Sequence, residues 1–78
     1  MKLPRNVSPV RVIALLQSLH YRLAPQRGNH ICLRRPSKPV HVVTFLNQDP
    51  LEARTLRGII AEVSYEAFVP VAALIGRL

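Results

Sequence analysis

The chain has 78 residues, a length suited to one domain, and we assign residues 1–78 to a single domain. Apolar residues make up 49% of it, which supports a folded core and excludes global disorder. No stretch approaches the roughly 20 consecutive apolar residues that cross a bilayer, and residues 1–6 lack the apolar segment of a secretory signal. Because Cys32 is the only cysteine, an intrachain disulfide and a cysteine-based metal cage are excluded. These absences favour a cytoplasmic protein with no membrane partner, no metal and no small-molecule cofactor.

The charge balance is the strongest compositional signal. Eleven Lys and Arg residues against four Asp and Glu give a net charge of +7, and nine of the eleven are Arg. Such a basic domain binds polyanions, which include nucleic acids, acidic proteins and anionic membrane surfaces. The excess of Arg favours nucleic acid, because a planar guanidinium can bind one phosphate through two hydrogen bonds. A membrane surface is less favoured, since the basic residues alternate along expected strands and do not line one helix face.

A first helix is expected after Ser8, which is a good N-cap, with Pro9 at the first helical position. One apolar stripe at helical spacing follows, consisting of Val12, Leu15, Leu16 and Leu19. The helix should end near Leu19. His20 then lies past its end, where it serves helix closure better than chemistry.

A short strand is expected from Tyr21 to Gln26, and Pro25 confines it to an edge or an end of the sheet. Gly28 and Asn29 both tolerate positive φ and therefore predict a tight hairpin turn. His30 should open the strand that follows this turn.

The second strand shows which of its side chains face the core. Side chains alternate between the two faces of a strand, and Ile31 and Leu33 share one face. If these aliphatic residues face the core, His30, Cys32 and Arg34 lie on the open face.

A basic, proline-rich turn over residues 35–39 leads to a third strand over 41–45. Alternation in this strand places His41 on the core side, so we expect it to be a structural histidine. A loop over 47–54 follows, and Thr55 is the expected N-cap of the next helix.

The second helix should bury a stripe formed by Leu56, Ile59, Ile60 and Val63. Gly58 interrupts it and suggests a point where a strand passes close. Ser64 is expected to cap a last helical piece, which Pro70 kinks or restarts. The resulting order, α-β-β-β-α with a helical tail, predicts an α+β fold in which helices cover one face of a three-stranded antiparallel sheet.

The turn before His30 carries the functional prediction. A histidine titrates near neutral pH, whereas arginines attract phosphate at any pH. Because RNA supplies its own nucleophile, the 2′-OH, a histidine among arginines is the minimum set of groups that a metal-independent ribonuclease needs. His30 is therefore the candidate catalytic residue, acting as a general acid or base. The candidate RNA-binding residues are Arg22, Arg27, Arg34, Arg35, Lys38, Arg54 and Arg57.

Three motifs in this order and spacing resemble one known family, the HicA toxins, also called YcfA-like proteins. They are the opening residues 1–8 (MKLPRNVS), the turn 27–30 (RGNH) and the helix start 55–60 (TLRGII). The resemblance runs from Met1 to about Phe68. Members are cytoplasmic mRNA interferases of type II toxin–antitoxin systems, with a fold like that of double-stranded-RNA-binding domains.

The resemblance implies that His30 is the catalytic residue and that Gly28 and Asn29 shape its turn. It also implies two partners, mRNA and a HicB-like antitoxin. The chain differs from the usual pattern at Asn29, where Ser or Thr is common. It differs again at residues 46–48, which replace a Pro and a second His, so no auxiliary histidine is expected there.

Two alternatives stay open at this point. The chain can be a non-catalytic RNA-binding module of the same fold, which recognises A-form shape and backbone without cutting. It can also be a basic interaction protein whose partner is an acidic chain. A two-metal nuclease is disfavoured, because Asp49 and Glu52 are the only acids close to each other ahead of the second helix.

Overall fold

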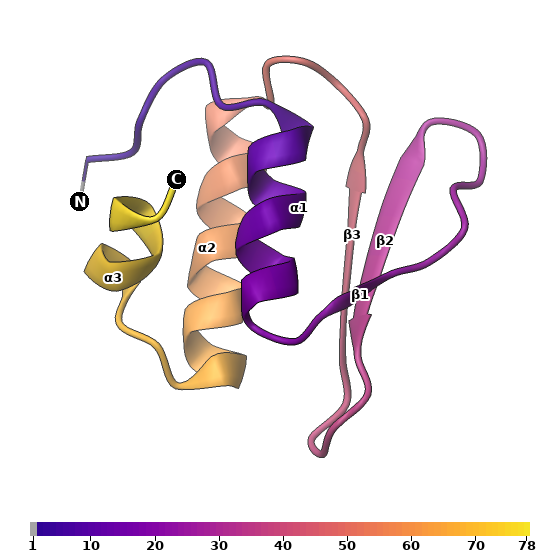
Figure 1. Cartoon of the computed structure of the whole chain (residues 1–78). Helices are drawn as coiled ribbons and strands as arrows, with labels where there is room; N and C mark the ends of the chain where they lie inside the picture. The colour runs from indigo at the N-terminus through magenta and orange to yellow at the C-terminus, as the bar shows by residue number, and fades with distance from the viewer. Residues whose placement is uncertain (1) are drawn as a thin grey trace.

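Three strands form one antiparallel sheet in the order β1-β2-β3, and helices α1 and α2 lie on the same side of it (Figure 1). The computed structural model describes residues 2–78. Its elements are α1 (Pro9–Ser18), β1 (Arg22–Leu23), β2 (His30–Arg35), β3 (His41–Leu46), α2 (Ala53–Ala67) and α3 (Val71–Gly76). Helix α3 packs against α2 on the side away from the sheet (Figure 1). The predicted α+β order with a helical tail is confirmed.

The helix-facing side of the sheet and the apolar stripes of the helices form the core. Ile31 and Leu33 of β2, with Val43 and Phe45 of β3, are buried as their alternation predicts. The predicted stripe of α2 is buried in full, and in α1 the buried residues are Pro9, Val12, Leu15 and Leu16. Leu74 of α3 is also fully buried and extends this core beyond α2.

Helix α1 begins at Pro9, as predicted, but the Ser8 side chain makes no capping hydrogen bond. The helix ends through a backbone motif centred on His20, whose φ is +72°. The His20 amide donates to the Gln17 carbonyl (3.1 Å) and the Tyr21 amide donates to the Leu16 carbonyl (3.0 Å). These two bonds define a Schellman closure, in which glycine is the usual left-handed residue. His20 therefore closes the helix, as expected.

The second helix begins earlier than Thr55, the predicted N-cap. Glu52 has an extended backbone and its carbonyl accepts from the Leu56 amide (3.0 Å), so α2 starts at Ala53 and Thr55 lies in its first turn. Ser64 starts no new piece, because α2 continues through it to Ala67. No helix within residues 2–78 combines the length and the apolar character needed to span a membrane.

The end of α2 is set by Phe68, which has a left-handed backbone with φ of +56°. The Ser64 hydroxyl donates to the Val69 carbonyl (2.6 Å) and holds this reversal. Pro70 then stands at the N-cap of α3, so the restart of the helix at this proline is confirmed.

Strand β1 is shorter than predicted, because the pairing with β2 shifts by one residue. Arg22 lies opposite Arg34, and the Ala24 amide still donates to the Cys32 carbonyl (2.9 Å). The next bridge joins Arg27 to His30, which leaves residues 25 and 26 together opposite residue 31. Two residues facing one is the pattern of a β-bulge. Pro25, which has no amide hydrogen to offer to the ladder, stands inside it.

Gly58 was expected to mark a close approach of a strand, and this expectation is wrong. The residue is exposed, and a Cβ built there meets no atom within 4 Å. Gly28 is different, because its φ of +58° is a conformation that side chains disfavour.

Replacing Gly58 by Ala should raise the free energy of unfolding by about 1 kcal/mol, because Ala forms helix better and meets no steric barrier at this site. Denaturant titration measures this difference. Gly28→Ala is the matched control and should lower the stability. A destabilised Gly58→Ala variant would show that the backbone needs glycine there for a reason other than space.

Candidate functional site

His30 is the first residue of β2, and its side chain is exposed on the sheet face that no helix covers. A tight turn precedes it, closed by the His30 amide, which donates to the Arg27 carbonyl (3.1 Å). Gly28 takes the positive φ, whereas Asn29 does not. Positive φ at the first central residue alone is the pattern of a type II′ turn. The predicted turn is therefore present, with Gly28 as its only left-handed residue.

Two further hydrogen bonds hold this turn. The Gln26 side-chain amide donates to the Gly28 carbonyl (3.0 Å). The Asn47 backbone amide donates to the Asn29 carbonyl (2.6 Å) and so ties the turn to the chain just after β3. Asn29 thus supports the turn through its backbone carbonyl.

The β-bulge determines which side chain lies beside His30. Without the shift of one residue, Gln26 would face His30 across the hairpin. With the shift, Arg27 is the residue paired with His30. Bulges re-aim side chains in this way and are frequent next to active sites. Of the predicted phosphate-binding residues, Arg27 is therefore the one that lies opposite His30 in the hairpin.

His30 and Arg27 share a hollow of about 400 Å³ on the open face. Its lining is completed by Ala24, Pro25, Cys32 and Thr44. Thr44 was not among the predicted site residues, although it lies opposite Cys32 across β2 and β3. Its place in the site follows from the pairing of β2 with β3, and the register of this pairing is seen only in the structure.

A second group of cations lies farther along the same face. Arg22 and Arg34 are paired across β1 and β2, so their side chains share the open face, and both are exposed. Arg34 is four residues from His30 along β2, which corresponds to about 13 Å at the rise of an extended strand. The open face thus carries arginines on both sides of Cys32.

No acidic residue offsets these cations on the sheet. None of the three strands contains Asp or Glu. Glu62 and Glu66 belong to α2, Glu52 precedes it, and Asp49 lies in the loop after β3. In the described part of the chain, Glu62 contacts His41, which is an ion pair only when the imidazole is protonated, and Glu52 forms an ion pair with Arg54; neither contact is on the open face.

The other predicted RNA-binding residues do not join this face. Arg35 is buried on the helix side of β2, with its guanidinium bonded to backbone carbonyls, so it is not available to a surface ligand. Lys38 is exposed in the turn between β2 and β3. Arg54 and Arg57 are exposed on α2, in the layer on the other side of the sheet from the open face.

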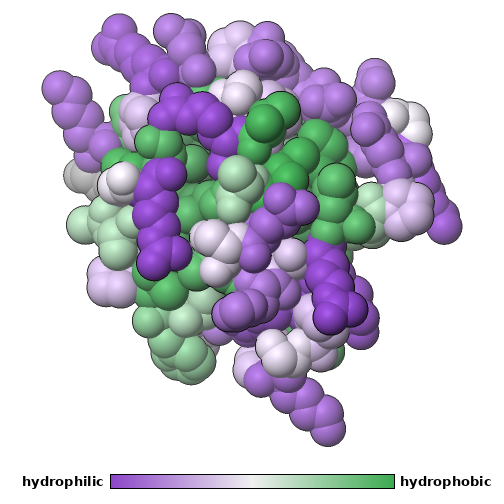
Figure 2. All heavy atoms as spheres, viewed as in Figure 1, coloured by the Kyte–Doolittle hydropathy of each residue, from purple (hydrophilic) through white to green (hydrophobic). Residues whose placement is uncertain are grey.

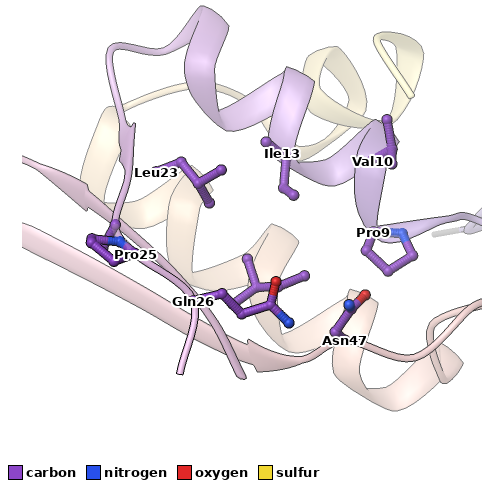
Figure 3. A pocket seen from close by; sticks show the side chains of 9 residues that line it. Pro9, Val10, Ile13, Leu23, Pro25, Gln26 and Asn47 are labelled. Atoms are coloured by element: carbon purple, nitrogen blue, oxygen red, sulfur yellow. The ribbon is translucent and has the colours of Figure 1, made fainter. Parts of the chain in front are cut away.

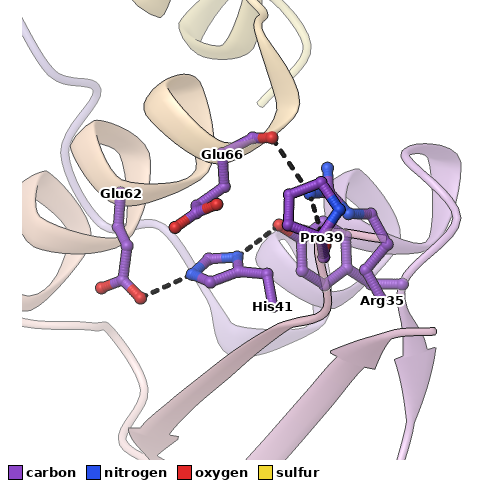
Figure 4. A network of polar contacts seen from close by, with 6 residues as sticks. Arg35, Pro39, His41, Glu62 and Glu66 are labelled. Atoms are coloured by element: carbon purple, nitrogen blue, oxygen red, sulfur yellow. Dashed lines mark hydrogen bonds and ion pairs between the residues drawn. The ribbon is translucent and has the colours of Figure 1, made fainter. Parts of the chain in front are cut away.

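A second histidine, His41, lies in a buried polar network (Figure 4). The Glu62 carboxylate can only accept, so in the neutral imidazole Nε2–H donates to Glu62 Oε1 (2.6 Å). Nδ1 then accepts from the Tyr21 hydroxyl (2.6 Å). Arg35 lies over the Tyr21 ring, 5.6 Å from its centroid. The predicted structural role of His41 is confirmed.

This network resembles a catalytic triad in its connectivity but not in its surroundings. Tyr21 is only 2% exposed, so no substrate reaches its hydroxyl. Burial raises the pKa of Tyr21, with Glu66 and Glu62 adding to the rise and Arg35 opposing it. An activated nucleophile needs the opposite shift. The network therefore stabilises the fold.

An apolar groove of about 540 Å³ lies between α1 and the edge of the sheet, lined by residues that include Val10, Ile13 and Leu23 (Figure 3). Figure 2, which has the view of Figure 1, shows hydrophobic side chains in the middle and at the lower left, with hydrophilic side chains between and around them. The groove has no titratable group in its lining. Within residues 2–78, no three His, Cys, Asp or Glu side chains gather where a metal ion could bind.

Comparisons of the chain with protein-family models, with curated proteins and with solved structures found no significant match.

The Tyr21 network should give the protein a defined response to alkaline pH. Because the pKa of Tyr21 is raised in the folded state, its contribution to stability is complete below pH about 10 and is lost as the pH rises through the raised value. Tyr21→Phe should destabilise the protein by about 1–3 kcal/mol at pH 7, since His41 Nδ1 loses its donor.

The difference in unfolding free energy between wild type and Tyr21→Phe should then shrink above pH about 10, as measured by denaturant titration at several pH values. Tyr65→Phe is the matched control, because Tyr65 is 80% exposed and should behave as wild type. A constant difference at all pH values would contradict the proposed donor role.

Proposed function

We propose that this chain is a metal-independent endoribonuclease of the HicA type, the toxin of a cytoplasmic type II toxin–antitoxin system, with mRNA as its substrate and a HicB-like antitoxin as its inhibitor. The observation that carries the proposal is an exposed histidine, His30, that shares a hollow with Arg27 on a sheet face whose strands contain no acidic residue. The motif resemblance supports the choice of family.

The chemistry assigned to the site is phosphoryl transfer within RNA. The 2′-OH attacks the adjacent phosphorus, the bond to the 5′-oxygen breaks, and a cyclic phosphate and a free 5′-OH are formed. One imidazole can take the 2′ proton or protonate the leaving 5′-oxygen, and water carries out the other transfer. General acid–base help of this kind is typically worth about 10²- to 10⁴-fold.

The arginines bind the phosphate and stabilise the charge that develops on it. We assign the scissile phosphate to Arg27, because its pairing with His30 supports this role. We assign phosphates on one side of the cut to Arg22 and Arg34, which lie farther along the open face. Thr44 adds a hydroxyl to the hollow that can donate to a phosphate oxygen.

A non-catalytic RNA-binding module remains the second candidate, and one observation favours it. The hollow holds one histidine and no carboxylate, and its other lining residues are Ala24, Pro25, Arg27, Cys32 and Thr44. Binding without cleavage is the result that would select this candidate.

Cleavage of a long mRNA should fall by about 10²- to 10⁴-fold in His30→Ala, because the proton transfer is removed while the phosphate-binding arginines stay. EDTA should leave the wild-type rate unchanged, and a DNA strand of the same sequence should not be cut. Product lengths on a denaturing gel give the rates.

His20→Asn is the matched control, since Asn tolerates the left-handed backbone of this helix closure. It should cleave as wild type does. Cleavage by His30→Ala at the wild-type rate would remove this residue from the mechanism, and RNA binding without any cleavage by the wild type would select the binding module.

RNA binding should weaken in Arg34→Ala. On single-stranded RNA, the slope of log affinity against log salt should also become shallower by about 0.7 for each phosphate that the variant no longer neutralises. Arg54→Ala is the control, because Arg54 lies on α2 beside Glu52 (3.8 Å) and away from the open face. Fluorescence anisotropy at several salt concentrations measures both slopes. Equal weakening in the two variants would show that RNA does not select the open face.

A further inference from the structure

Strand β3 is an edge of the sheet, since the strand order is β1-β2-β3. The hydrogen bond from the Asn47 amide to the Asn29 carbonyl continues the β2–β3 register and shows which residues of β3 bond to β2. In an antiparallel ladder, hydrogen-bonded pairs alternate with non-bonded pairs. Residues 41, 43 and 45 therefore bond to β2. The N–H and C=O groups of Val42, Thr44 and Leu46 point away from β2, to the free side.

The two edges of the sheet differ in how they are protected. Proteins block an edge with short strands, charged side chains, proline or bulges. The β1 edge has all four, because this strand is two residues long and is followed by Pro25 and the β-bulge, with Arg22 exposed on it. The β3 edge has six residues and contains no proline, Lys, Arg, Asp or Glu. Its one titratable residue, His41, is buried.

The side chains that accompany the free backbone groups are uncharged. Val42 and Leu46 are each 46% exposed, and Thr44 is exposed between them. All three lie on the open face. In a chain with net charge +7, this edge is a segment where two copies can meet without placing like charges in contact.

We propose that β3 pairs antiparallel with β3 of a second copy of this chain, about a two-fold axis at Thr44. This register places Thr44 opposite Thr44 of the second copy and Val42 opposite Leu46 of the second copy, all as hydrogen-bonded pairs. A strand that matches its own reverse is what a two-fold interface requires. Hydroxyl and apolar cross-strand pairs of these kinds are favourable.

The dimer joins two sheets into one and places both open faces on the same side. One row of side chains across the joined sheet then runs from His30 through Leu46 to Val42, Arg34 and Arg22 of the second copy. Three strand spacings separate His30 from that Arg34, or about 14 Å. The second copy therefore extends the cationic surface on the β3 side of His30, where the sheet of a single chain ends.

The contact is small, because it involves one strand of six residues, so the dimer is expected to be weak. Screening of the +7 charge on each copy should strengthen it as salt rises. This salt response is opposite to that of RNA binding. The dimer would form whether or not the chain cleaves RNA.

Sedimentation equilibrium of the RNA-free full chain, from micromolar to millimolar concentration, tests the proposal. The average mass should rise with concentration toward twice the 8.8 kDa of one chain, and more steeply in high salt. Thr44→Lys should shift this rise to several-fold higher concentration, because two like charges then lie directly opposite each other. Val10→Lys adds the same charge at an exposed position of α1, away from β3, and this variant should dimerise as wild type does.

Disulfide trapping tests the register. In a Cys32→Ser background, Thr44→Cys should form a cross-linked dimer on mild oxidation, since hydrogen-bonded partners lie about 5.5 Å apart at Cα. Val42→Cys alone should not, but a mixture of Val42→Cys and Leu46→Cys chains should. A mass that stays at one chain up to millimolar concentration, an unaltered Thr44→Lys dimer, or equal trapping at Thr44 and Val42 would overturn the proposal.

Discussion

The burial of Ile31 and Leu33 against the helices is the constraint on which the rest of the molecule depends. These side chains are 5% and 0% exposed, and they fix which face of β2 is inside. A slip of one residue would expose both and bury their neighbours. The outward position of His30, Cys32 and Arg34 is therefore a consequence of core packing. Core packing thereby positions the candidate site.

The same alternation draws Arg35 inward, where a cation is costly unless it is well bonded. Its guanidinium donates to the Pro39 carbonyl (3.1 Å) and the Glu66 carbonyl (3.0 Å) and lies over Tyr21. Within residues 2–78, its Nε atom has no hydrogen-bond partner. Arg35 thus connects β2, the turn before β3 and the last turn of α2. Together with the His41–Glu62 contact, it anchors the end of the sheet opposite to His30.

Alternation and helical spacing were enough to predict the fold. The apolar stripes of α1 and α2 and the buried faces of β2 and β3 are each visible in a few consecutive residues, because burial repeats with the period of the element. The helix boundary at Glu52 was not predictable in this way. Thr55 is the better N-cap by residue type, but the buried position of Leu56 is compatible with either start.

The site was predictable in its central residue and less so in its surroundings. His30 and Gly28 are local to one turn, so the sequence reveals them. The neighbours Arg27 and Thr44 depend on pairing between strands, and no single segment contains that information. The interior position of Arg35 follows from the alternation of side chains in β2. Because Arg35 also begins the basic, proline-rich turn over residues 35–39, an exposed position was equally reasonable.

The β-bulge at residues 25 and 26 has a consequence for how this hairpin can vary. Deletion of either residue would bring the two strands back into phase, but the turn through Gly28 and Asn29 would keep Arg27 paired with His30. The single residue left between Ala24 and Arg27 would then lie opposite Ile31. The guanidinium beside His30 is therefore exchanged only if the turn lengthens to three residues and Gln26 closes it.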